Sequence, residues 1–294
     1  EEAGIDALRI DTYTYPNQNF MARLNKVVRT HYPRMVLFGE TWVHNHQSQA
    51  YFAGGFPLRP SDNRLNSVTD FQTYFALKET VTKASGWNEG VGKLYQSLAG
   101  DYLYQDPYRL VTFADNHDEG RYFGLCGEDL RKYKLGLTLL YTLRGIPCLY
   151  YGTELLMKST ENHGTMREDV PGGWPGDSRN AFTAAGRTPR EQEAFDFVQK
   201  LGNYRKSQAA LHNGKMMQFA PENGLYAVAR YTQDRLILTV VNASDQPATV
   251  SMERFDELLN KKRDAIRALD RTPVRLTERW EAGAWSSEIF EFQR

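Results

Sequence analysis

Five short apolar runs, which alternate with longer amphipathic segments as far as about residue 206, constrain the fold of this chain most strongly. The runs have the length of β-strands and cover residues 5–11, 35–40, 67–70, 110–115 and 147–151. The segments with helical spacing of apolar residues cover 19–30, 71–84, 90–98, 130–143 and 190–205. Apolar strands that alternate with helices are typical of a parallel sheet covered by helices. The sequence therefore predicts an α/β domain over residues 1–211.

A different pattern begins near residue 212. Alternating runs cover 216–219, 225–231 and 235–241, and Asn223-Gly224 stands between the first two. An Asn-Gly pair between alternating runs is a strong signal for a β-hairpin. We therefore predict a separate antiparallel β-sandwich over residues 212–294. The charged stretch 253–267 also has helical periodicity, so a helix there remains an alternative.

Acidic residues stand at the ends of three apolar runs. Asp11 and Glu40 end the first two runs, and Asp118 follows the fourth by a few residues. Active sites of (β/α)₈ barrels are assembled where the carboxyl ends of parallel strands meet, so we expect these side chains to converge on one cleft. For each of them alone, a helix cap or a surface ion pair is the alternative.

The neighbours of these acids favour a catalytic role. Arg9 lies two residues before Asp11, and the period of two in a strand places both side chains on one side, where a guanidinium orients the carboxylate. Gly39 precedes Glu40 and allows close approach of other groups. His117 adjoins Asp118.

Four ordered motifs resemble the α-amylase family, glycoside hydrolase family 13. They are residues 4–11 (GIDALRID), 38–42 (FGETW), 113–118 (FADNHD) and 145–154 (GIPCLYYGTE). The resemblance covers roughly residues 4–206 and implies the C-terminal part, about strands 4 to 8, of a TIM (β/α)₈ barrel. The run 166–177 is most similar to the neopullulanase and cyclomaltodextrinase branch.

The resemblance implies a retaining glycosidase that acts on α-glucosidic bonds of starch-type glucans. By resemblance, Asp11 attacks the anomeric carbon, and Glu40 protonates the leaving oxygen and then activates water. Asp118 holds the sugar hydroxyls, and Arg9 and His117 support these acids. A retaining mechanism also needs one ionised and one protonated carboxyl group about 5–5.5 Å apart, and the acidic pair fits this requirement.

Further polar and aromatic residues are candidates for binding the glucan. Trp42, Trp174 and Tyr13 are candidate stacking platforms for sugar rings, with packing as the alternative. Asp177 is expected to reach a neighbouring subsite, or else to pair with Arg179.

The expected ligand is an α-glucan oligosaccharide or a cyclodextrin. The 36 basic and 36 acidic residues cancel, so no global field attracts nucleic acid or an anionic membrane. No apolar run approaches the roughly 20 residues of a membrane span. We expect no cofactor in the chemistry and no metal, since a polar loop explains His44 and His46; a structural calcium ion in the full-length enzyme stays open.

The resemblance also indicates what is missing. The motif at residues 4–11 belongs to the fourth barrel strand, and no segment here matches the first three strands. We therefore expect a fragment of a longer enzyme, or a chain that needs a complementary chain or N-terminal barrel segment. Little activity is expected of the isolated 294 residues. No signal segment can be read, and a periplasmic or secreted location is favoured over a cytoplasmic one.

Two other functions remain as alternatives. One is an α-glucan transglycosylase on the same scaffold, in which a sugar replaces water as the acceptor. The other is a non-catalytic family member that serves as a binding subunit. The presence of Asp11, Glu40 and Asp118 together argues against the second.

Overall fold

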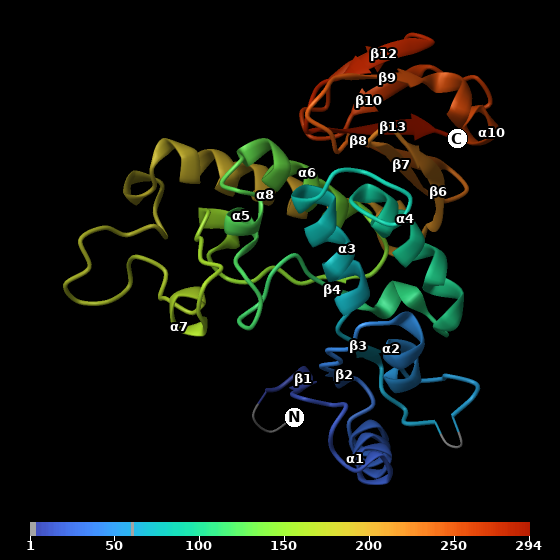
Figure 1. Ribbon diagram of the computed structural model, residues 1–294. Helices are drawn as coiled ribbons and strands as arrows, with labels where there is room; N and C mark the ends of the chain where they lie inside the picture. Colours follow the sequence, from blue (N-terminus) through green and yellow to red (C-terminus); the bar gives the residue numbers. More distant parts are fainter. Residues whose placement is uncertain (1–3, 60–61) are drawn as a thin grey trace. The chain divides into compact units, whose positions relative to one another are not determined.

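The computed structural model describes residues 4–59 and 62–294 (Figure 1). The chain forms two compact units. The first is made of Glu1–Ala76, Gln96–Phe113 and Arg144–Cys148, and the second of Leu77–Tyr95, Ala114–Leu143 and Leu149–Arg294. This division does not follow the predicted domain boundary at residues 211 and 212, which stays a prediction.

Five parallel strands form the sheet of the first unit. They are β1 (Ala7–Ile10), β2 (Val36–Gly39), β3 (Ser67–Val68), β4 (Val111–Thr112) and β5 (Ile146–Pro147). β1 pairs with β2, β2 with β3 and β4 with β5, and a bridge between Thr69 and Val111 joins β3 to β4. Parallel strands paired in chain order are the arrangement of a (β/α)₈ barrel wall, so the predicted partial barrel is confirmed.

Helices separate the strands at the predicted places. The helices of the chain are α1 (Gln18–His31), α2 (His46–Phe52), α3 (Phe71–Thr82), α4 (Val91–Ala99), α5 (Tyr122–Leu125), α6 (Leu130–Thr142), α7 (His163–Met166), α8 (Pro189–Ser207), α9 (Ala209–Asn213) and α10 (Asp256–Leu259). Short 3₁₀ turns are η1 (Gly100–Leu103), η2 (Pro107–Arg109), η3 (Thr153–Leu155), η4 (Ala184–Gly186) and η5 (Met252–Phe255). None of the helices found in residues 4–59 and 62–294 is long and apolar enough to cross a membrane.

Side-chain caps explain where several of these helices begin. Asn17 caps α1 by accepting a hydrogen bond from the backbone of Phe20, and Thr188 and Glu191 form a capping box at α8. The short helix α2 was not predicted, because seven residues are too few for an apolar period to show. Its one sequence signal is Asn45, whose side chain accepts from the backbone of Ser48.

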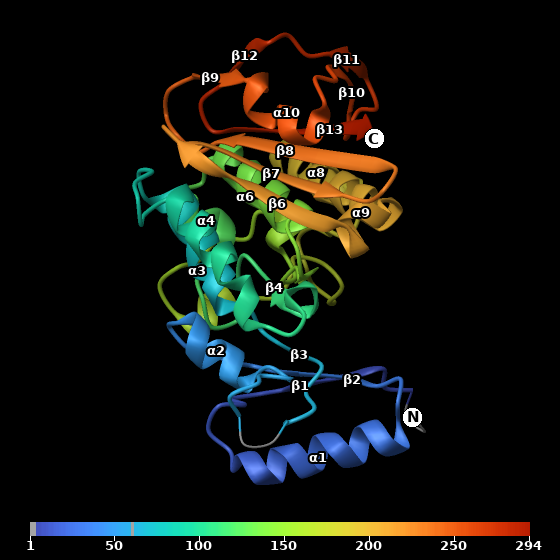
Figure 2. The ribbon, with the colours of Figure 1, turned by 90° about the vertical axis from the view of Figure 1, so that its right-hand side faces the viewer.

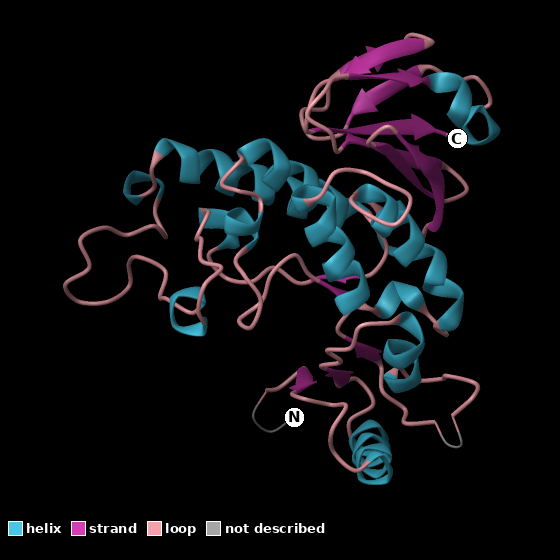
Figure 3. Ribbon diagram, in the orientation of Figure 1, coloured by secondary structure: helices cyan, strands magenta, loops and turns pink. Residues whose placement is uncertain are grey.

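The antiparallel strands lie in the second unit, and the longest of them exceed every strand of the first unit in length (Figure 3). They are β6 (Lys215–Glu222), β7 (Leu225–Tyr231), β8 (Arg235–Asn242), β9 (Ala248–Ser251), β10 (Asp264–Arg267), β11 (Pro273–Arg275), β12 (Arg279–Ala282) and β13 (Ser286–Gln293). Six of them form one sheet in the order β11-β10-β13-β8-β7-β6, and β9 pairs with β12. Figure 2 shows β6, β7 and β8 side by side, and contacts with α6 and α9 support this sheet.

The hairpin between β6 and β7 is confirmed. Asn223 and Gly224 have φ angles of 50° and 84°, the left-handed conformation that a two-residue turn requires.

The charged stretch 253–267 contains both helix and strand: its first part forms η5 and α10, and its end forms β10. The helical alternative was therefore right for the first part only. An apolar core that includes Phe219, Leu238 and Phe290 holds the strands together.

A buried ion network stabilises the first unit. Arg144, which is fully buried, follows α6 and donates to Asp70 at 2.6 Å and to Asp101 at 2.6 Å. Although burial opposes ionisation, the Arg144 guanidinium helps to hold the pKa of Asp70 below its usual value. The network joins three segments that are distant in sequence.

Replacement of Arg144 by methionine is expected to lower the free energy of unfolding by about 3–5 kcal/mol, because the buried Asp70 and the partly buried Asp101 lose their partner. Urea denaturation of the purified variant measures the loss. Arg131→Gln is the matched control, since Arg131 forms an exposed pair with Asp129 and its loss should leave stability unchanged. An Arg144→Met variant as stable as this control would contradict the assigned role of the network.

Candidate active site

The ends of β1 and β2 bring two carboxylates together. Asp11 directly follows β1 and Glu40 directly follows β2. The two strands are parallel neighbours in which Ile10 is aligned with Gly39, so the next residues, Asp11 and Glu40, are neighbours as well. The Glu40 backbone N–H donates to the Ile10 carbonyl at 2.9 Å, and the Glu40 carbonyl accepts from Tyr13 at 3.0 Å. Backbone hydrogen bonds therefore fix both acids at one edge of the sheet.

Arg9 connects the two carboxylates. Its Nη1 donates to Asp11 Oδ1 at 2.8 Å, which confirms the contact expected from the period of two. Its Nη2 donates to Glu40 Oε1 at 2.7 Å, a contact that was not predicted. The backbone N–H of Thr12 donates to the other Glu40 oxygen, Oε2, at 2.9 Å. One guanidinium thus orients two acids, as bidentate arginine contacts do.

The two acids differ sharply in exposure. The Asp11 side chain is 66% exposed, whereas that of Glu40 is 7% exposed. A ligand can approach the Asp11 carboxylate directly, while Glu40 is held among protein groups. The difference follows from the places of the two strands, because β1 is at the edge of the described sheet whereas β2 has a neighbour on each side.

Gly39 is required for close packing beneath the site. A Cβ atom at position 39 would lie 2.5 Å from Cγ of Tyr13, so any side chain would displace that ring. The expected close approach at Gly39 is therefore confirmed. Tyr13 is fully buried, and its hydroxyl accepts a hydrogen bond from Asn25 at 3.0 Å. The suggestion that Tyr13 is a stacking platform for sugar is wrong, because its ring is part of the core.

The aromatic and imidazole side chains after β2 pack on α3. Trp42 is 41% exposed, and its ring stacks on Phe71 with centroids 5.3 Å apart. His44 stacks on Phe75 at 5.1 Å, and His46 is the first residue of α2. Within the part of the chain that the structure describes, no group of three or more His, Cys, Asp or Glu side chains is arranged to hold a metal ion.

The second unit holds the other predicted catalytic residues. His117 Nε2 lies 3.1 Å from Asp118 Oδ2, and Arg167 Nη2 donates to Asp118 Oδ1 at 2.6 Å. Arg167 Nε also donates to the carbonyl of His117 at 3.0 Å. Arg167 was not predicted, because 49 residues separate it from Asp118 and no local pattern links them. Asp11 and Glu40 belong to the first unit, so the convergence of all three acids on one cleft stays a prediction.

Asp115 anchors the segment that carries His117 and Asp118. It is buried, and its carboxylate accepts hydrogen bonds from the Thr153 hydroxyl at 2.8 and 2.9 Å and from the Tyr122 backbone at 2.9 Å. Burial raises the pKa of Asp115 to about 6, although these hydrogen bonds oppose the shift.

The pKa of Asp115 predicts a pH dependence of stability. An unfolded Asp has a pKa near 3.9, so the folded chain retains a proton that the unfolded chain loses between about pH 4 and 6. The contribution of this group to stability is present below pH 4 and is lost as the pH rises through 6, by an amount on the order of 3 kcal/mol.

The measurement is the free energy of unfolding at pH 4, 5, 6 and 7 for the native chain and for Asp115→Asn. Asparagine retains an acceptor for Thr153 and Tyr122 but does not titrate. The difference between the two chains should shift in favour of Asp115→Asn as the pH rises. A constant difference would show that Asp115 ionises in the folded chain as it does when unfolded.

The glycine-rich segment at 171–177 presents an exposed tryptophan. Asp177 Oδ2 accepts from the backbone N–H groups of Gly172 at 2.9 Å and of Trp174 at 3.0 Å, and Trp174 is 66% exposed. Arg179 pairs with Glu191 at 2.7 and 2.8 Å. The alternative that Asp177 and Arg179 pair with each other is therefore wrong, and Asp177 instead shapes the loop.

Two family models match this chain. Residues 2–172 match the family described as the α-amylase catalytic domain. Residues 216–291 match the family described as the cyclo-malto-dextrinase C-terminal domain. The first match covers more than half of the chain.

Relatives of this chain match most of it but only part of their own length. A cyclomaltodextrin glucanotransferase from Geobacillus stearothermophilus is 27% identical over 83% of this chain and 31% of its own length. A cyclomaltodextrinase from a Bacillus species is 27% identical over 82% of this chain and 39% of its own length. The chain thus spans about a third of these relatives.

The fold also resembles that of solved structures. The α-amylase from Geobacillus thermoleovorans, solved in complex with acarbose, superposes with a TM-score of 0.79 at 22% identity. The match covers 100% of this chain and 61% of that one. It supports the same combination of barrel strands and antiparallel domain.

Proposed function

The chain belongs to the α-amylase catalytic-domain family, and from this premise we propose that its protein is a retaining glycoside hydrolase acting on α-glucosidic bonds of starch-type glucans. The observation that carries the proposal is the double contact of Arg9 with Asp11 and Glu40 at adjacent strand ends. Two carboxylates on one guanidinium provide the pair that a retaining mechanism needs. An α-glucan oligosaccharide or a cyclodextrin is the proposed substrate.

Asp11 is the proposed nucleophile. Its exposed carboxylate would attack the anomeric carbon and form a covalent glycosyl-enzyme, while the bond to the leaving oxygen breaks. Arg9 holds the Asp11 oxygen that it contacts, so the other oxygen is available for the attack. This arrangement positions the nucleophile before the substrate arrives.

Glu40 is the proposed acid and base. It donates a proton to the leaving oxygen in the first step and takes a proton from water in the second. Both Glu40 oxygens accept hydrogen bonds in this structure, from Arg9 and from Thr12. Because a proton donor needs a free hydroxyl, we propose that the contact of Glu40 with Arg9 opens when the glucan binds, while the contact of Arg9 with Asp11 remains.

His117 and Asp118 are proposed to bind the hydroxyl groups of the reacting sugar. Their hydrogen bonds would strengthen as the ring flattens toward an oxocarbenium-like transition state. Arg167 supports this proposal because it contacts the Asp118 carboxylate and the His117 carbonyl, and so fixes the pair. Substrate hydroxyls would then meet a carboxylate that is already oriented.

Trp42 and Trp174 remain proposed stacking surfaces for further sugar rings. Trp174 suits this role better, since Trp42 uses one ring face against Phe71. Asp177 is proposed to act on the substrate through Trp174, whose backbone it holds.

Transglycosylation is the second candidate function. The cyclomaltodextrin glucanotransferase and the cyclomaltodextrinase match this chain at the same identity, so sequence identity favours neither function. The two functions differ in whether a sugar or water accepts the glycosyl group. The chemistry up to the glycosyl-enzyme is common to both.

The test is an NMR measurement of the products formed from maltoheptaose by the protein as its gene encodes it. We expect the first new reducing ends in the α configuration, because two displacements restore the original stereochemistry. Shorter products with a net gain of reducing ends indicate hydrolysis, whereas products longer than the substrate, formed without such a gain, indicate transfer to sugar. A first product in the β configuration would contradict the retaining mechanism.

A further inference from the structure

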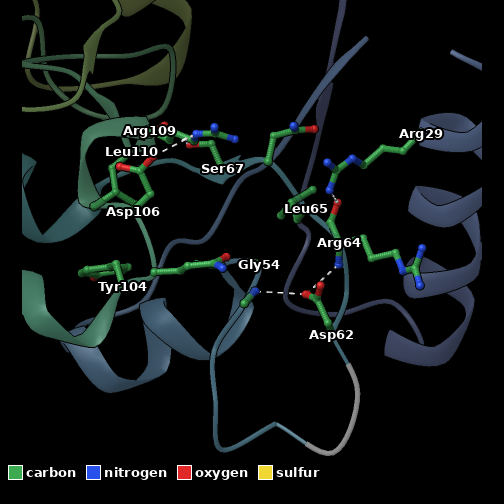
Figure 4. Close-up of a pocket in the computed structure, with 14 residues that line it drawn as sticks. Arg29, Gly54, Asp62, Arg64, Leu65, Ser67, Tyr104, Asp106, Arg109 and Leu110 are labelled. Atoms are coloured by element: carbon green, nitrogen blue, oxygen red, sulfur yellow. Dashed lines mark hydrogen bonds and ion pairs between the residues drawn. The ribbon is translucent and has the colours of Figure 1, made fainter. Parts of the chain in front are cut away.

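A cavity lies at the opposite ends of the strands from Asp11 and Glu40. Its volume is about 390 Å³, and all its lining residues belong to the first unit. Ser67, the first residue of β3, and Leu110, which precedes β4, both line it (Figure 4). Because the strands are parallel, this cavity is at their amino ends, whereas the candidate catalytic acids are at their carboxyl ends.

Three arginines from separate segments border this cavity. Arg29 belongs to the last turn of α1, Arg64 to the loop before β3, and Arg109 ends η2. Figure 4 shows Arg29 and Arg64 on one side and Arg109 on the other. We call this space the arginine cavity.

The acidic residues of the arginine cavity already have partners. Asp62 Oδ1 accepts from the backbone N–H groups of Gly55 at 3.0 Å and Arg64 at 2.9 Å. Although partial burial opposes the shift, these backbone hydrogen bonds hold the pKa of Asp62 below its usual value. Asp106 accepts from the backbone of Tyr108 at 3.1 Å and pairs with Arg109 Nε at 3.0 Å.

Several donors of the arginine cavity are left over. Arg29 Nη1 donates to the Arg64 carbonyl at 3.1 Å, and its remaining N–H groups have no acceptor among the described residues. The Arg64 guanidinium forms no hydrogen bond with another described residue, and its positive charge, like that of Arg29, attracts the Asp62 carboxylate through space. Asn66 accepts from the Leu37 backbone at 3.0 Å through Oδ1, which leaves its NH₂ group as a donor. The cavity therefore offers more donors than acceptors.

We propose that the arginine cavity binds a small metabolite through its phosphate group, with Arg29, Arg64 and Arg109 as the anion ligands. Planar guanidinium groups match the geometry of phosphate oxygens and form charge-assisted hydrogen bonds with them. The volume falls in the range of small-molecule sites and leaves space for an organic group besides the phosphate. The site is independent of the proposed glycosidase chemistry.

The test is isothermal titration of the protein as its gene encodes it with inorganic phosphate, at constant ionic strength maintained with chloride. Saturable binding is expected, with a dissociation constant of about 1 mM or below. Arg64→Gln and Arg109→Gln should each weaken binding about tenfold or more. Arg23→Gln is the matched control, because Arg23 is exposed on the same helix as Arg29 but does not line the cavity.

Two comparisons complete the experiment. A hexose monophosphate should bind more tightly than inorganic phosphate, since its sugar fills the remaining volume. Maltoheptaose should not displace phosphate, and Asp11→Asn should bind phosphate as the native protein does. The proposal is overturned if phosphate gives no saturable heat, if Arg64→Gln and Arg23→Gln bind alike, or if the hexose phosphate binds no better than phosphate.

Discussion

Replacement of Asp11 by asparagine is expected to lower kcat for maltoheptaose by about 10³-fold or more, in the protein as its gene encodes it. The amide is nearly the same size as the carboxylate, so the strand end and the Arg9 contact with its oxygen persist. It is a poor nucleophile, and no glycosyl-enzyme forms. Initial rates of reducing-sugar release measure the effect.

Asp6→Asn provides the control for the Asp11 substitution. Asp6 is an exposed acid just before β1, and its side chain has no assigned part in catalysis. The control should retain native kcat. Small anions such as azide should restore turnover in Asp11→Ala, because they enter the vacated space and attack the anomeric carbon. If Asp11→Asn retains more than a tenth of the native kcat, Asp11 is not the nucleophile.

Arg9→Lys is expected to lower kcat by about 10²–10³-fold, with a much smaller change in KM. Lysine retains the positive charge, but its single ammonium group lacks the planar guanidinium geometry with which Arg9 orients the Asp11 carboxylate and releases Glu40 when the glucan binds. The effect should therefore appear in the chemical step rather than in substrate binding. Separate determination of kcat and KM with maltoheptaose distinguishes these two outcomes.

A second readout separates positioning from general damage in Arg9→Lys. The pH profile of kcat should change its shape, because Arg9 contacts both the proposed nucleophile, Asp11, and the proposed acid and base, Glu40. Arg23→Gln on α1 is again the control and should keep the native profile. An increase in KM alone, with kcat and the pH profile unchanged, would contradict the role given to Arg9.

The parallel strands could be predicted because each lies in a short apolar run of strand length. The predicted runs are longer than the observed strands, since Ile5 before β1 and Ala114 after β4 extend the apolar pattern beyond the paired residues. The Asn223-Gly224 hairpin was predicted for a local reason, the left-handed turn. The helix α2 was missed because seven residues carry too little periodicity.

The candidate site could be predicted only where its contacts are local. The Arg9 contact with Asp11 follows from the period of two within one strand. Two other contacts, of Arg9 with Glu40 and of Arg167 with Asp118, depend on how distant segments of the chain come together. No local pattern specifies this. Tyr13 was misjudged because burial of an aromatic ring is decided by packing against distant residues, here Gly39 and Asn25.

The central claim, that Asp11 forms the covalent intermediate, is tested most directly by trapping it. The Glu40→Gln variant is incubated with α-maltosyl fluoride, whose leaving group needs no proton, so that the first step proceeds while water is no longer activated. The protein is then digested and its peptides are examined by mass spectrometry. We predict a maltosyl group on the peptide that contains Asp11, and none in the double variant with Asp11→Asn. An adduct on another carboxylate, or fluoride release without any adduct, would contradict the account.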